Sequence, residues 1–175
     1  MKNQPGQCDT DTAPAATIPQ LVAQAAARFG DTLFLEEDGT RISFGDFARQ
    51  AQQVAAALLA RGIQTGDRIA IWAPNISEWV IAAIGAQCAG AVLVTLNTRY
   101  KGSEAAYILR ASRARLLFSI GHFLDTDYPA QLARLPDRPE RPPLFFLVTN
   151  GAEPDCIRAF AAGADDYVHL PISPE

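Results

Sequence analysis

Short apolar runs alternate with segments of helical periodicity through the middle of this chain, and few folds accommodate that order. Runs of strand length lie at 68–72, 91–96 and 115–120, and the segments 77–89 and 103–112 between them have helical character. Neighbouring parallel strands must be joined by a crossover connection. The connections here are short, so the helical segments between the strands are expected to form these crossovers. The pattern predicts an α/β fold: a partial doubly wound, mostly parallel sheet with helices on both faces.

The residues before this alternation predict a helix, a β-hairpin and a second helix. Apolar residues recur at helical spacing over 18–29, and Gly30 follows as a stop signal. Two short strands within 32–44 flank an Asp-Gly turn at 38–39, which predicts an N-terminal β-hairpin. Ser43 is placed to cap the second helix.

Two finer expectations concern the parallel unit. The segment Ala91–Leu96 is a continuous apolar run, which is typical of a strand covered on both faces. The helix over 77–89 needs an acceptor for its first N–H groups, and Asn75 or Ser77 is expected to cap it.

The composition changes after about residue 130. Residues 135–143 hold four prolines among Asp, Arg and Glu, which is typical of a linker. Beyond them we expect a strand at 144–148, a short helix at 153–162 and a last strand ending at 170. The predicted organisation is a disordered tail at 1–16, an incomplete α/β subdomain at 17–134, a proline-rich linker at 135–143 and an α/β tail at 144–175.

Three stretches resemble the N-terminal part of AMP-forming acyl-CoA synthetases, over about residues 17–130. RISFGDF at 41–47 resembles the family's early L-[ST]-Y-x-E-L element, with conservative departures. GDRIAIWAPN with a following EW, at 66–79, resembles GDRVAIxxPNxxEW. AGAVLVTLNTRY at 89–100 resembles AGAVxVPLNTR, with Thr95 where the family usually has Pro. The order and spacing of all three fit the family.

The resemblance implies a reaction and also where its residues should lie. Complete family members use Mg-ATP to convert a carboxylic acid to an acyl adenylate, then pass the acyl group to CoA. A Ser/Thr/Gly-rich loop holds the ATP phosphates, with a Lys at its end, an acidic residue in a Tyr-Arg-Thr-Gly-Asp context and a C-terminal Lys. These 175 residues contain none of these motifs, and their only lysines are Lys2 and Lys101.

We therefore expect no catalytic, cofactor-binding or metal-binding residue in this chain. ATP, Mg and CoA would serve the complete family enzyme, whose catalytic segments would follow Glu175. The interpretation is a truncated N-terminal portion of an acyl-CoA synthetase, a ligase of fatty acid metabolism, that is inactive alone. Whether the chain is itself an enzyme stays open, and so does its acyl substrate.

The segment Pro143–Glu175 has a second likeness, to the end of a response-regulator receiver domain. It reads PLFFLVTNG…AGADDYVHLPISPE, with Leu170 at the position of the receiver's Lys and Val148 at that of its Thr. The competing interpretation is that Phe160–Ala164 is a segment native to the synthetase. The alternative function is accordingly a non-enzymatic regulatory or interaction fragment with a degenerate receiver-like tail, or a gene fusion artefact.

Several polar and aromatic residues could invite a functional assignment, but each lacks partners at the required spacing. Adjacent carboxylates point apart, cations after a strand end are ordinary loop charges, and serines need a base within reach. Structural roles are expected for all of them: His122, His169, Asp165, Asp166, Arg99, Lys101, Trp72, Trp79, Ser112 and Ser119.

Charge and cysteine content limit which partners and which cellular compartment the sequence favours. The net charge of -4 gives no reason to expect nucleic acid or an anionic membrane as a partner. No apolar stretch is long enough to predict membrane insertion. Cys8, Cys88 and Cys156 lack paired spacing and are interpreted as free thiols in the cytoplasm. A partial sheet leaves an edge uncovered, which favours self-association through that edge.

Overall fold

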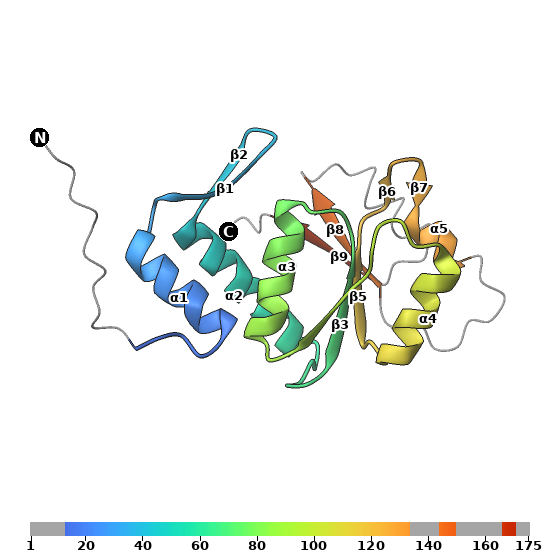
Figure 1. Ribbon diagram of the computed structural model, residues 1–175, viewed down its shortest axis with the longest axis horizontal. Coiled ribbons are helices and arrows are strands. Elements are labelled where there is room, and N and C mark those ends of the chain that lie inside the picture. Colours follow the sequence, from blue (N-terminus) through green and yellow to red (C-terminus); the bar gives the residue numbers. More distant parts are fainter. Residues whose placement is uncertain (1–12, 134–143, 150–165, 171–175) are drawn as a thin grey trace, which may run out of the picture.

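The computed structural model of this chain describes residues 13–133, 144–149 and 166–170 (Figure 1). Its helices are α1 (Ile18–Phe29), α2 (Phe44–Ala60), α3 (Ser77–Cys88), α4 (Gly102–Ser112) and α5 (Tyr128–Ala133). Its strands are β1 (Leu33–Glu37), β2 (Thr40–Ser43), β3 (Arg68–Trp72), β4 (Val92–Thr95), β5 (Leu116–Ser119), β6 (His122–Phe123), β7 (Thr126–Asp127), β8 (Leu144–Thr149) and β9 (Asp166–Leu170).

The central sheet has five parallel strands in the order β4-β3-β5-β8-β9. The chain moves from β3 to its neighbour β4 through α3, then reverses past β3 to reach β5 through α4. Because parallel crossovers are right-handed, this reversal puts α3 and α4 on opposite faces of the sheet. Figure 1 shows α3 on one side of the strands, with α4 and α5 on the other. The predicted α/β architecture with a parallel sheet is confirmed.

The N-terminal hairpin and its cap form where the local sequence predicts them. β1 and β2 pair antiparallel with Glu37 opposite Thr40. Asp38 and Gly39 both have positive φ, at 44° and 83°, as a tight two-residue hairpin turn requires. Ser43 then caps α2, because its Oγ accepts a hydrogen bond from the Asp46 N–H at 3.0 Å.

Helices α2 and α3 pack against each other so closely that one position tolerates no side chain. A Cβ at Gly85 of α3 would lie 2.5 Å from Cβ and Cγ1 of Val54 and 2.9 Å from the Ala51 carbonyl oxygen, both on α2. The apolar face of α2, from Phe47 to Leu58, is buried in the same core as β3. The glycine therefore sets how closely the two helices approach.

The expectation that β4 is covered on both faces is wrong. Val92 is 51% exposed, Thr95 is also exposed, and the two residues between them are only partly buried. In the part of the chain that the structure describes, β4 is the edge strand of the sheet and has β3 as its single neighbour. Apolar composition indicates a buried strand but does not show which strand takes the edge.

The expected cap of α3 is also wrong. The N-cap residue is Ile76, which offers no side-chain acceptor, and Ser77 is the first residue of the helix. The N–H of Ser77 instead donates to Oε2 of Glu37 at 2.6 Å. The hairpin therefore satisfies a helix terminus that lies far along the chain.

Both strands expected after residue 143 are present. β8 pairs parallel with β5, with Leu117 opposite Leu144, and β9 pairs parallel with β8. The expected linker at 135–143, the helix at 153–162 and most of the predicted N-terminal tail lie outside the described residues.

Candidate functional site

The topology creates one position where an α/β sheet commonly binds a ligand. The crossover through α3 leads from β3 to β4 on one side, and the crossover through α4 leads to β5 on the other side of β3. The carboxyl ends of β3 and β5 therefore lie at a switch point of the sheet. Trp72 ends β3, Ser119 ends β5, and the two residues are paired across the strands. This edge of the sheet is therefore the first place to look for chemistry.

Two aromatic side chains fill the switch point. Trp72 and Tyr128 are 0% and 1% exposed, and their rings meet edge-to-face with centroids 4.6 Å apart. Trp72 Nε1 donates to the Asn97 carbonyl oxygen at 3.0 Å, and Tyr128 Oη donates to that of Thr98 at 3.1 Å. Burial raises the pKa of Tyr128, which keeps its hydroxyl a donor at neutral pH. Both polar groups thus hold the loop after β4 in place.

Ser119 is paired with Trp72 across the two strands, and its hydroxyl is held by backbone groups. Its side chain is buried, and Oγ lies 3.1 Å from the carbonyl oxygens of both Trp72 and Ile120. No base contacts it among the hydrogen bonds of the described residues, and His122 is exposed. A serine held by backbone carbonyls in this way is not activated as a nucleophile.

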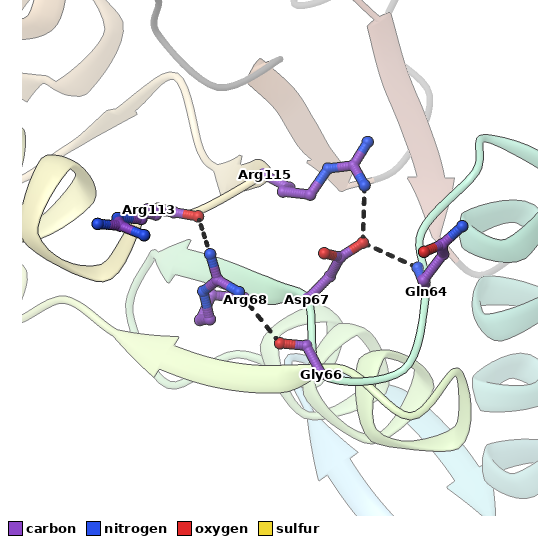
Figure 2. A network of polar contacts seen from close by, with 6 residues as sticks. All are labelled: Gln64, Gly66, Asp67, Arg68, Arg113 and Arg115. Atoms are coloured by element: carbon purple, nitrogen blue, oxygen red, sulfur yellow. Dashed lines mark hydrogen bonds and ion pairs between the residues drawn. The ribbon is translucent and has the colours of Figure 1, made fainter.

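A polar network joins the opposite, amino-terminal ends of the strands (Figure 2). The Asp67 carboxylate accepts from the backbone N–H of Gln64 at 2.9 Å and from Arg115 Nη1 at 3.0 Å. The Arg115 side chain is 50% exposed and that of Asp67 only 15%. The contact links the start of β3 to the residue immediately before β5.

Arg68 is the second centre of this network. Its Nε donates to the Ser112 carbonyl oxygen at 2.8 Å and its Nη2 to that of Arg113 at 3.0 Å. Its Nη1 donates to the Gly66 carbonyl oxygen at 3.2 Å. The guanidinium therefore caps the C-terminal end of α4, where unpaired carbonyls favour a cation. All three of these nitrogens bind backbone carbonyl oxygens. The Gly66-Asp67-Arg68 motif therefore joins the start of β3 to the C-terminal end of α4 and to the residue before β5.

A buried carboxyl with a raised pKa lies at the start of α3. Glu78 is 8% exposed, and Ser77 Oγ donates to its Oε2 at 3.1 Å. Burial raises the pKa of Glu78, and the negative charge of Glu37 adds to that shift. Such a carboxyl can mark an active site. The hydrogen-bond partners of Glu78 are its own backbone N–H, at the start of the helix, and the Ser77 hydroxyl, which indicates a structural role for Glu78.

The other residues considered from the sequence come from several different elements. Arg99 and Lys101 are exposed, and the Lys101 N–H donates to Glu104 Oε2 at 2.7 Å where α4 begins. Trp79 packs against the core, and Ser112 Oγ donates to the Leu109 carbonyl oxygen at 3.2 Å. The remaining residues are placed as follows: His122 in β6, Asp166 and His169 in β9, Cys88 free at the end of α3, and Asp165, Cys8 and Cys156 outside the described residues.

The sequence patterns did not identify Tyr128 or the polar network around Asp67 and Arg68. Tyr128 lies beyond the last resembling motif, and nothing local to it indicates that Trp72 is its partner. Within 13–133, 144–149 and 166–170, no group of three or more His, Cys, Asp or Glu residues could hold a metal ion. None of the helices in those ranges has both the length and the apolar character needed to cross a membrane.

A family model described as "AMP-binding enzyme" matches residues 22–165 of this chain. A methyl-dioxo-octahydroindenyl propanoyl:CoA ligase of Rhodococcus jostii is 32% identical over 159 residues, covering 91% of this chain and 30% of the ligase. The medium-chain acyl-CoA ligase ACSF2 of Danio rerio is 31% identical over 123 residues, covering 69% of this chain and 20% of the ligase. The chain thus spans less than a third of the length of these curated relatives.

A solved structure shares the fold over most of the chain. The structure of a protein assigned as a long-chain-fatty-acid CoA ligase from Rhodopseudomonas palustris has a TM-score of 0.66 and 28% identity. That match covers 79% of this chain and 34% of the other.

Proposed function

The chain belongs to the AMP-binding enzyme family, and from that membership we propose that it forms the N-terminal portion of an ATP-dependent, AMP-forming acyl-CoA synthetase and is inactive alone. The carrying observation is the family match over residues 22–165, together with relatives that are CoA ligases. The proposed reaction is activation of a carboxylic acid to an acyl adenylate, followed by formation of a CoA thioester. In this proposal the residues that the structure describes support the fold of the enzyme and do not take part in the reaction.

Inactivity follows from the charge that the reaction develops. Attack of a carboxylate on the α-phosphorus of ATP brings anions together and expels pyrophosphate, so donors and cations must already surround the phosphates. The 175 residues contain no Ser/Thr/Gly-rich phosphate loop. The guanidinium of Arg68 donates to three backbone carbonyl oxygens. ATP, Mg and CoA would therefore be bound through residues that this chain does not supply.

The C-terminal segment is best assigned to the same α/β body. The family match continues to residue 165, well past the proline-rich stretch 135–143. β8 and β9 extend the parallel sheet beside β5. These observations favour a segment native to the synthetase over the receiver-like origin, which stays a hypothesis. We retain the cytoplasm as the proposed compartment.

Assay of the purified chain tests the proposal. Mixed with Mg-ATP, CoA and a panel of fatty and aromatic acids, the chain should release neither AMP nor pyrophosphate. The Rhodococcus jostii ligase with its own acid is the positive control, and far-UV circular dichroism establishes that the assayed chain is folded. Release above a heat-killed control would show that the chain carries a catalytic site of its own.

A further inference from the structure

β4 presents an open backbone edge in the part of the chain that the structure describes. Its residues Val92–Thr95 pair with β3 on one side, without a register shift. The N–H of Val92 donates to the Asp67 carbonyl oxygen at 2.7 Å, and that of Leu96 to the Ile71 carbonyl oxygen at 2.9 Å. Along a strand, the backbone N–H and C=O groups of successive residues point alternately to the two sides. Those of Leu93 and Thr95 therefore point away from β3, toward the open edge.

This edge lacks the devices that normally keep edge strands apart. The sequence VLVT contains no charge and no proline, the strand has no bulge, and Val92 is 51% exposed. Natural proteins place lysine, proline or a bulge at such edges to prevent pairing with another chain. An uncharged strand can also face a copy of itself without like-charge repulsion.

We propose that the β4 edge docks the β4 edge of a second copy of this chain, antiparallel, to form one continuous sheet. A two-fold axis perpendicular to the sheet requires the antiparallel arrangement. The register that uses both outward-facing residues is centred on Val94, with Leu93 opposite Thr95 of the other copy. That register makes each such pair exchange both N–H···O=C bonds. The proposal does not depend on the proposed enzymatic role.

The occupant is a second copy because two copies of this edge meet without bringing like charges together. In the proposed register Val92 faces Leu96 and Leu93 faces Thr95, so uncharged side chains line the whole contact. The strand is short, which makes the expected dimer weak and dependent on concentration.

Amide hydrogen exchange combined with sedimentation velocity tests this, with the full chain kept under reducing conditions so that cysteines cannot crosslink. Raising the protein concentration should produce a dimer and slow exchange at Leu93 and Thr95. The amides of Val92 and Leu96 already donate within the sheet and should show no comparable change. They serve as internal controls.

Three variants separate this edge from any other surface. Thr95→Pro removes an outward N–H and leaves the β3 ladder intact, so the dimer should be lost, whereas Thr95→Val keeps that N–H and should still dimerise. Val92→Lys should also abolish the dimer, and it decides the matter if Thr95→Pro does not fold. A wild-type chain that stays monomeric, or a dimer that persists in folded Thr95→Pro or Val92→Lys, overturns the proposal.

Discussion

The carboxylate of Glu37, at the end of β1, accepts a hydrogen bond of 2.6 Å from the backbone N–H of Ser77, the first residue of α3. The two residues are 40 positions apart. A negative charge at a helix N-terminus is stabilising, and an unpaired N–H there is unfavourable where water is excluded. This bond therefore couples the hairpin to the helix that packs on the central sheet.

Replacement of Glu37 should weaken that coupling. Glu37→Ala removes the acceptor and should lower the free energy of unfolding by about 1 kcal/mol, the usual value of a helix cap. The matched control is Glu36→Ala, since Glu36 makes an exposed ion pair with Arg41 and should contribute about 0.5 kcal/mol or less. Urea unfolding of both variants measures the difference, and equal losses would show that the cap contributes nothing specific.

Glu78 should make stability depend on pH. Its folded-state pKa lies above its ordinary value because of burial and then the charge of Glu37. The folded state therefore binds the proton more tightly, and this contribution is present below the ordinary pKa and lost as pH rises through the raised one. Glu78→Gln should flatten stability over that window, measured by urea unfolding at a series of pH values. An unchanged pH profile would contradict the assignment.

Gly85 provides a steric test of the α2–α3 interface. Gly85→Ala places a Cβ 2.5 Å from Val54 and should destabilise the fold by roughly 1–3 kcal/mol despite alanine's better helix propensity. Gly45→Ala in α2 is the control, because its Cβ would come no closer than 3.4 Å to the Gly30 carbonyl oxygen. That variant should be neutral or more stable, and thermal unfolding compares the two. Equal stability of both would mean that the helices separate freely.

Features set by neighbouring residues could be predicted from the sequence. The Asp38-Gly39 turn needs only two residues with positive φ, and the Ser43 cap acts on an N–H three residues away. The alternation of strands and helices likewise follows from local apolar patterns. For the same reason, the parallel sheet could be predicted before its order was known.

Features that depend on contacts between distant segments could not be predicted. The cap of α3 comes from Glu37, so a search beside Ser77 does not find it. The exposure of Val92 depends on β4 lying at an edge, and strand order is not a property of the strand's own residues. The partner of Trp72 is Tyr128, which no spacing rule connects to it. The candidate site was the part of the structure least predictable from the sequence, because its residues come from the ends of different elements.

The last prediction decides whether the C-terminal segment is separable. β5 pairs with β8, and the β5 side chains Leu117 and Phe118 are 1% and 2% exposed. A chain ending at residue 133 would turn β5 into an edge and open part of the core, and each large apolar side chain that regains full exposure costs about 1.5–3 kcal/mol. We expect the shortened chain to unfold at clearly lower urea concentration than the full chain, or not to fold. A shortened chain with the full chain's unfolding midpoint would instead support the fusion hypothesis, in which the segment after the proline-rich stretch is an independent addition. Limited trypsin digestion gives a second readout at Arg134, because Arg138 and Arg141 each precede a proline and resist trypsin. Cleavage at Arg134 that releases a folded core would agree with separability, and resistance there would agree with one continuous sheet.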